Sequence, residues 1–146
     1  MFLIQLGTGA IMIIIMVLIH AVVLDRLLIL LESIGPDIYQ KFRRYWKVPM
    51  LTVAVCGTFL AHTIEIWVWA FFYMAVGALP HLEEALYFST STFTTVGFGD
   101  IVLTKDWRLV SSFQSAIGFI LFGWSTAFIF EVMTKLYKQD KIRKTD

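Results

Sequence analysis

Thr94-Thr95-Val96-Gly97-Phe98-Gly99-Asp100 is the stretch of sequence on which the interpretation of the whole chain depends. Two glycines flank one aromatic residue, hydroxyl residues precede them and a carboxylate follows. Glycine accepts left-handed backbone angles, so Gly97 and Gly99 allow successive carbonyls to point the same way instead of alternating as in a strand. Such a row of carbonyls is a cation ligand. Several copies around an axis would form stacked rings of oxygen that replace the water shell of a monovalent ion.

The composition is that of a membrane protein. Of the 146 residues 58% are hydrophobic and the mean hydropathy is +0.75, against roughly 45–50% apolar residues in soluble domains. The net charge of +1 gives no field that would attract nucleic acid. The single cysteine, Cys56, excludes a disulfide framework and is expected to be a small buried hydrophobe.

Three apolar stretches are each long enough to cross a bilayer, which takes about 20 residues. They predict transmembrane helices over residues 1–33, 48–78 and 107–137. Gly35-Pro36 is expected to end the first helix. Residues 34–47 are then a cytoplasmic amphipathic linker, either a short helix at the membrane surface or a solvated loop.

A fourth helix is predicted over residues 82–93. Glu83 and Glu84 lie in its first turn, where the helix dipole favours negative charge. At this length the helix cannot span a bilayer. We therefore expect a re-entrant pore helix, because non-helical backbone at membrane depth is tolerated only where protein or a water-filled cavity surrounds it.

The orientation follows from the positions of lysine and arginine. Five lie between the first two spans and five near the C-terminus, whereas two lie close to residues 94–100. The positive-inside rule then places the basic tail, residues 138–146, in the cytoplasm and the N-terminus and Asp100 outside. We expect a multi-pass protein of the cell membrane.

Residues Thr95 to Asp100 resemble the selectivity filter of potassium channels, in the variant with phenylalanine where tyrosine is more frequent. The resemblance covers residues 48–137, which together would form the pore domain. It implies that residues 48–78 are the outer helix and residues 107–137 the inner helix. It implies an all-α membrane protein with three transmembrane helices, a re-entrant pore helix and a filter loop over residues 94–100. It also implies a homotetramer, so that the partners are three further copies and membrane lipids.

The resemblance also assigns roles within the filter. The carbonyls of Thr95, Val96, Gly97 and Phe98 would bind K⁺, with the Thr95 hydroxyl as a further ligand, and Gly99 would supply the outer turn. The ions would be the cofactor, and no organic cofactor is expected.

Two departures from the family pattern affect the support of this filter. Phe98 lacks the phenol hydroxyl that commonly braces it, and Ser91 stands where some bacterial relatives carry a glutamate. Tyr87 lies where its hydroxyl can reach Asp100 from behind. Support from Tyr87, Ser91 and Asp100 is thus expected to rest mainly on Tyr87 and Asp100, in a filter prone to inactivation.

The inner helix carries the candidates for gating. Gly118 resembles the hinge glycine of this family and Gly123 its packing glycine, although close packing explains Gly118 equally well. A further set of residues shares one face by helical spacing and is expected to line the cavity: Phe119, Phe122, Thr126 and Phe130. Phe130 is nearest the cytoplasm and would form a hydrophobic constriction.

His62 and Glu65 are i, i+3 neighbours near the middle of a span, where an ionised side chain costs roughly 2.5–3.5 kcal/mol. We expect them to pair with each other or with a neighbouring helix. They form either a proton sensor or a satisfied structural pair. His20 is a possible partner from the first helix, or it reaches the cytoplasmic interface.

Three functions are left open by the sequence. The first is a potassium-selective channel, the second a non-selective monovalent cation channel, and the third a non-conducting anchor or sensory subunit. An enzyme is excluded because no nucleophile, base and orienting group can be assembled. A repeat of basic residues for voltage sensing is missing from the sequence, and a separate regulatory subunit remains possible.

Overall fold

The computed structural model describes residues 1–143, without the side chain of Arg143. It contains α1 (Phe2–Phe42), a 3₁₀ turn η1 (Arg43–Tyr45), α2 (Lys47–Ala75), α3 (Leu82–Phe93) and α4 (Arg108–Arg143). Three helices, α1, α2 and α4, are long and apolar enough to cross a membrane. The 12 residues of α3 extend about 18 Å, well short of the roughly 30 Å hydrocarbon core. The predicted tail over residues 138–146 is described only as far as residue 143.

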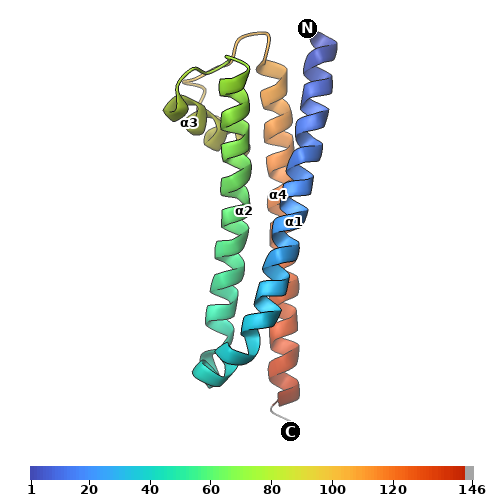
Figure 1. Cartoon of the computed structure of the whole chain (residues 1–146), viewed down its shortest axis with the longest axis vertical. Coiled ribbons are helices and arrows are strands. Elements are labelled where there is room, and N and C mark those ends of the chain that lie inside the picture. Colours follow the sequence, from blue (N-terminus) through green and yellow to red (C-terminus); the bar gives the residue numbers. More distant parts are fainter. Residues whose placement is uncertain (144–146) are drawn as a thin grey trace.

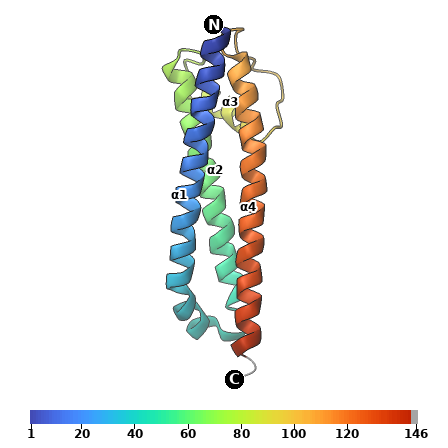
Figure 2. The same ribbon diagram turned by 90° about the vertical axis from the view of Figure 1, so that its right-hand side faces the viewer.

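The three long helices run side by side along the length of the molecule (Figures 1 and 2). Direction alternates from α1 to α2 to α4, so the start of α1 and residues 76–107 lie at one end. The C-terminus lies at the other. The short helix α3 packs against α2 and α4 at the first of these ends. The N-terminal helix is no detached anchor, because it contacts both α2 and α4.

The prediction that Gly35-Pro36 ends the first helix is wrong. Helix α1 continues through Pro36 to Phe42, so residues 34–47 form its last turns and η1 instead of a separate linker. Figure 1 shows these turns leaning toward the base of α2. A proline removes one backbone hydrogen bond, but Ile38 and Tyr39 pack against the apolar cluster that α1, α2 and α4 share. This tertiary packing keeps the segment helical.

Two apolar clusters hold the bundle together. The larger, at the α3 end, centres on buried aromatic side chains of α2 and α3, among them Trp69, Tyr73 and Phe93. The smaller cluster, at the opposite end, contains buried side chains of α1, α2 and α4, with Trp46 among them. Residues 94–100 lie beside the larger cluster.

Close approach of helices at small residues adds to this packing. A Cβ atom on Gly9 of α1 would lie 2.3 Å from the Phe113 ring of α4, and one on Gly57 of α2 would lie 2.5 Å from Leu27 of α1. In a bilayer, such van der Waals contact replaces the hydrophobic effect as the source of helix association. Glycine at these two positions therefore fastens α1 to the other helices.

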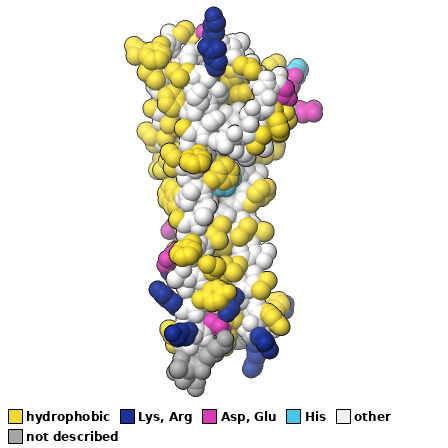
Figure 3. Space-filling model, turned by 180° about the vertical axis from the view of Figure 1, so that it is seen from behind, with side chains coloured by type: hydrophobic (Ala, Val, Ile, Leu, Met, Phe, Trp, Pro, Cys, Tyr) yellow, Lys and Arg dark blue, Asp and Glu magenta, His cyan; other side chains and the backbone are white. Residues whose placement is uncertain are grey.

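The surface is apolar along most of its length. Figure 3 shows lysine and arginine side chains gathered at the end that holds the C-terminus, with a smaller basic group at the α3 end. Cys56 lies exposed on α2, so the prediction that it is buried is wrong. Its helix face is turned away from the neighbours that a single chain provides.

Candidate functional site

Helix α3 has the bounds that the sequence predicts, Leu82 to Phe93. It begins after His81, whose backbone is extended, and Glu83 and Glu84 occupy its first turn. Its buried side chains fix its position, because Ala85, Phe88 and Phe93 belong to the larger apolar cluster. The helix ends directly at residues 94–100, which we term the glycine segment.

The backbone of the glycine segment alternates between left-handed and ordinary conformations. Thr95, Gly97 and Gly99 have φ angles of 62°, 53° and 81°, whereas Val96 and Phe98 are not in the left-handed region. A regular strand keeps negative φ at every residue and points successive carbonyls to opposite sides. Left-handed geometry is unfavourable for a β-branched residue such as threonine. Its occurrence at Thr95 marks a strained position of the kind that clusters at functional sites.

Helix α3 holds the start of this segment through backbone hydrogen bonds. The Thr95 amide donates to the Thr92 carbonyl at 3.0 Å, and the Gly97 amide donates to the Ser91 carbonyl at 3.0 Å. The Ser91 hydroxyl donates within α3, to the Phe88 carbonyl at 3.1 Å. Ser91 thus positions Gly97 through its backbone, and its side chain supports α3 instead of Asp100.

One side of the glycine segment is open in the single chain. Val96 is 55% exposed and Phe98 is 69% exposed. A Cβ atom built on Gly97 or Gly99 would meet nothing within 4 Å. The glycines are therefore required by their φ angles and not by crowding.

Tyr87 and Asp100 form the contact that the sequence predicts. The Tyr87 hydroxyl donates to Asp100 Oδ2 at 2.7 Å, and the Ile101 amide donates to Asp100 Oδ1 at 3.1 Å. The hydrogen bond to Asp100 raises the pKa of the Tyr87 phenol, with smaller contributions from desolvation and from the carboxylate charge. The Tyr87 ring also stacks on Phe98, with centroids 6.2 Å apart. This stacking was not predicted from the sequence.

Polar side chains of α4 fasten α3 from behind. Gln114 accepts a hydrogen bond from the Tyr73 hydroxyl at 2.9 Å and donates to the Ser89 carbonyl at 3.2 Å. Ser115 donates to the Thr92 carbonyl at 3.0 Å. These bonds use carbonyls in the last turns of α3, so α4 holds the end from which the glycine segment starts. Sequence analysis did not single out Gln114.

The two glycines of α4 differ in their surroundings. A Cβ atom on Gly118 would lie 2.1 Å from the backbone oxygen of Phe93, at the end of α3. Close packing therefore explains Gly118. A Cβ atom on Gly123 would meet nothing within 4 Å, so the packing prediction for Gly123 is wrong within the single chain. The difference arises because α3 reaches α4 at the level of Gly118.

The four residues of the predicted cavity face of α4 do not all lie on one exposed face. Phe119, Thr126 and Phe130 are exposed together. Phe122 belongs elsewhere, because its ring packs on His62 at 4.5 Å and on Phe93 at 5.7 Å between centroids. At 3.6 residues per turn Phe122 lies about 60° away from the line of the other three, which turns it toward α2 and α3.

His62 and Glu65 belong to a buried polar cluster that joins three helices. Glu65 Oε1 lies 2.8 Å from His20 Nδ1 of α1, and Glu65 Oε2 lies 3.0 Å from His62 Nδ1. The Ser125 hydroxyl of α4 lies 3.3 Å from His20 Nε2 and 3.0 Å from His62 Nε2. His20 is fully buried, which rules out its placement at the interface. Ser125 was missed, because a serine in an apolar helix carries no distinctive pattern.

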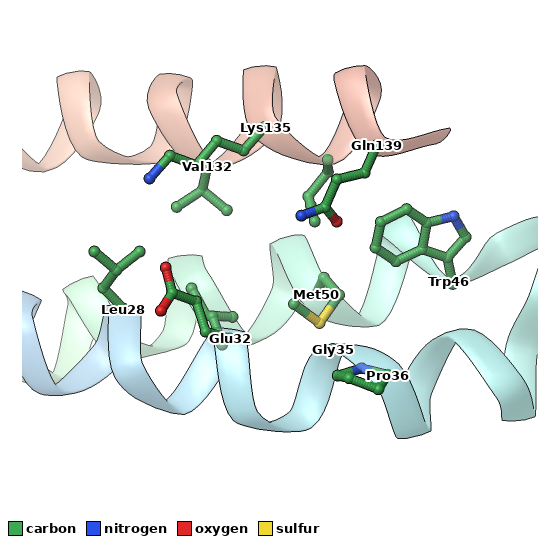
Figure 4. Close-up of a pocket in the computed structure, with 11 residues that line it drawn as sticks. Leu28, Glu32, Gly35, Pro36, Trp46, Met50, Val132, Lys135 and Gln139 are labelled. Atoms are coloured by element: carbon green, nitrogen blue, oxygen red, sulfur yellow. The ribbon is translucent and has the colours of Figure 1, made fainter. Parts of the chain in front are cut away.

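One hollow lies beside the glycine segment and another lies at the far end of the bundle. One of about 320 Å³ lies behind the glycine segment, with Thr95 and Gly97 on one wall and Ser111 and Ser115 of α4 on the other. Another of about 300 Å³ lies at the opposite end of the bundle. Figure 4 shows it between α1, α2 and α4, with Glu32 and Lys135 on facing helices. The second hollow is remote from the glycine segment.

Comparison with known proteins places this arrangement in a family. Curated proteins and solved structures yield no match to the chain. A family model described as ion channel matches residues 50–135, which is more than half of the 146 residues. The matched range includes α3, the glycine segment and most of α2 and α4. This is a family of channels and not of enzymes, which confirms that prediction. The chain belongs to the ion channel family.

Proposed function

We propose that the protein is a potassium-selective channel that conducts passively through a ring of four chains. The observation that carries this proposal is the alternation of left-handed φ at Thr95, Gly97 and Gly99 on a segment whose one side is open. A backbone that reverses the sign of φ at every second residue can turn successive carbonyls to one side. Rings of such carbonyls replace the hydration shell of K⁺.

In this proposal the carbonyls of Thr95, Val96, Gly97 and Phe98 are the ligands of K⁺, and the Thr95 hydroxyl adds an oxygen at the inner end. Gly99 forms the outer turn. Helix α3 is the re-entrant pore helix. Its C-terminal end carries the negative end of the helix dipole, which favours a cation beside Thr94.

Four copies of the chain complete the site. A single glycine segment presents ligands from one side, so it cannot surround an ion. The exposure of Phe98 and of the α4 face with Phe119, Thr126 and Phe130 supports an assembly in which these surfaces meet their copies. Phe130 is then the hydrophobic constriction nearest the cytoplasm. Membrane lipids cover the remaining apolar surface.

The distribution of charge supports one orientation. Lysine and arginine gather at the end with the C-terminus (Figure 3). By the positive-inside rule that end is cytoplasmic, and the N-terminus and the glycine segment face outward in the cell membrane.

A second candidate, a non-selective monovalent cation channel, is favoured by one observation. Neither Phe98 nor the Ser91 side chain donates a hydrogen bond that would brace the glycine segment, and Tyr87 provides the contact to Asp100. A less constrained ring of carbonyls discriminates less between K⁺ and Na⁺.

The reversal potential in planar bilayers separates these functions. Purified wild-type protein with K⁺ on one side and Na⁺ on the other is expected to reverse close to the K⁺ equilibrium potential. Gly97→Ala should abolish this selectivity, because a Cβ atom disfavours φ near 53°. Gly77→Ala is the matched control: Gly77 also has positive φ and open surroundings, but it lies in the turn after α2.

Reversal near zero with current present would refute potassium selectivity and support the non-selective channel. No current over a range of pH, voltage and lipid, also after Phe130→Ala, would refute both channel proposals. A loss of selectivity in Gly77→Ala equal to that in Gly97→Ala would remove the assignment to the glycine segment.

A further inference from the structure

We propose that His20, His62 and Glu65 form a binding site for a divalent transition-metal ion of the Zn²⁺ class. The site joins α1 to α2 in the interior of the bundle. It is separate from the proposed K⁺ sites in the glycine segment, and its existence does not depend on conduction.

The three side chains supply a suitable donor set. One ligand atom from each can be chosen so that all lie within 4.8 Å of one another. The two contacts of Glu65, 2.8 Å and 3.0 Å to the histidine Nδ1 atoms, are shorter than the roughly 3.3 Å that separates ligands around tetrahedral Zn²⁺. The widest pair of ligand atoms, up to 4.8 Å apart, must close toward this separation for the ion to bind. Two imidazoles and one carboxylate suit Zn²⁺ better than Ca²⁺ or Mg²⁺, which prefer oxygen ligands.

Ser125 provides the outer support that metal-binding histidines require. Both Nε2 atoms face its single hydroxyl oxygen, at 3.3 Å and 3.0 Å. The oxygen has two lone pairs and can accept an N–H bond from each ring. Protons on both Nε2 atoms leave both Nδ1 atoms unprotonated toward Glu65, which is the tautomer that a metal ion between them needs.

A neutral cluster without a metal leaves one hydrogen bond unmade. Without a metal, Glu65 accepts from both Nδ1–H groups, and two Nε2 lone pairs then face one serine hydroxyl. Its single hydrogen can serve only one of them. The other nitrogen lacks a donor unless the cluster takes up a further proton. With the metal bound, every nitrogen has a partner.

The cluster lies in the interior of the bundle, away from solvent. His20 and Glu65 are fully buried. Aromatic rings enclose the cluster: Trp124 lies 5.2 Å from His20, and Phe122 and Phe93 lie 4.5 Å and 5.8 Å from His62. A low local dielectric strengthens the attraction between the ion and Glu65.

Metal binding has a consequence for α4, and this step rests on the proposed function. Ser125 lies on the helix that carries Phe119 and Phe130, so an ion that fixes both histidines also fixes the position of α4. We expect the loaded channel to open less often than the metal-free channel.

The test measures metal content and needs no current. The full chain is produced in medium supplemented with Zn²⁺ or Co²⁺, purified and dialysed. Wild type is expected to retain one metal ion per chain, and the Co²⁺ form to show the intense visible absorption of tetrahedral coordination by nitrogen and oxygen. Glu65→Gln and His20→Gln should lose the ion. His81→Gln is the matched control, since His81 is exposed and remote from the cluster.

A variant that keeps all three ligands guards against misfolding. Ser125→Ala is expected to weaken Zn²⁺ binding by about 10–100-fold, the usual effect of removing an outer-sphere partner. Wild type without metal after exposure to both ions would overturn the proposal, and so would equal loss of metal in His81→Gln and His20→Gln. A chain that binds the ion but carries no current, also after a chelator has removed the ion and after Phe130→Ala, would refute the channel and leave the metal site standing.

Discussion

The glycine segment and the buried cluster around Glu65 solve the problem of polar groups in a membrane protein in different ways. Around Glu65 each ring nitrogen and each carboxylate oxygen has a neighbour from the same chain within 3.3 Å. In the glycine segment Val96 and Phe98 are largely exposed. The first region has its polar neighbours within a single chain, whereas the second leaves one side open.

This difference predicts that substitutions in the two regions affect different properties. Changes around Glu65 should alter the stability of each chain, because the cluster ties α1, α2 and α4 together. Changes in the glycine segment should alter what the assembly does and leave the single chain nearly as stable as before. The predictions below test this separation, starting from the largest effect on stability.

Glu65→Ala is expected to reduce the free energy of unfolding by about 3–5 kcal/mol, because two buried histidines lose their shared carboxylate. Chemical denaturation of detergent-solubilised protein in the presence of a chelator measures this. Glu84→Ala is the control, since Glu84 is exposed in the first turn of α3 and contributes at most about 1 kcal/mol. Equal effects of the two changes would contradict a special role of the cluster.

Gly118→Ala is expected to cost about 3 kcal/mol, the upper end of the usual range for overpacking, because its Cβ atom would meet the Phe93 carbonyl. Gly123→Ala should be neutral or raise stability by up to about 1 kcal/mol, since alanine is the better helix former and the position is open. Unfolding temperatures of the two variants provide the comparison. If Gly118 were only a hinge and made no close contact, the two variants would have the same unfolding temperature.

Tyr73→Phe is expected to cost about 1–2 kcal/mol, because the buried Gln114 Oε1 would lose its donor. Gln114 also donates to the Ser89 carbonyl of α3, which holds the start of the glycine segment, so a loss of both stability and selectivity is expected. Thermal unfolding and the reversal potential measure the two effects. Tyr45→Phe, at an exposed position of η1, should change neither.

Tyr87→Phe should leave the unfolding temperature unchanged and accelerate the decay of current by less than about tenfold, because one hydrogen bond to Asp100 is lost. The Tyr87 pKa is raised, so its hydroxyl remains a donor below its ordinary pKa of about 10, and the bond is lost only as the pH rises through the raised value. Wild-type decay should thus be constant from about pH 6 to pH 9. A decay rate unaffected by the substitution would contradict the support role of Tyr87.

Much of the fold followed from local sequence signals. Apolar length predicted the three long helices, and the acidic first turn at Glu83 and Glu84 indicated the start of the helix Leu82–Phe93. The failure at Pro36 has a tertiary cause, because Ile38 and Tyr39 find an apolar partner that no local pattern reveals. The exposed position of Cys56 likewise depends on which face of α2 the other helices cover.

The candidate sites were predictable to different extents. Spacing indicated that His62 and Glu65 pair, and His20 was one possible partner. The contribution of Ser125 depends on the relative height of α4, which the sequence does not encode locally. Spacing also placed Phe122 in the cavity. This prediction was wrong because i, i+3 spacing alone includes residues that lie about 60° away from the centre of the face. The left-handed angle at Thr95 was not predicted, since threonine rarely adopts it.

The contact between Gly118 and Phe93 links the position of α4 to the order of the glycine segment. Phe93 is the last residue of α3, and Thr94 begins the glycine segment. Because α4 touches the Phe93 carbonyl without an intervening side chain, a movement of α4 at this level is transmitted directly to the end of α3. In the proposed channel, a movement of the lower half of α4 that widens the pore at Phe130 would either turn about this contact or push on Thr94. Opening near Phe130 and loss of order in the glycine segment would then be parts of one movement. A substitution that weakens the contact between Gly118 and Phe93 would uncouple them.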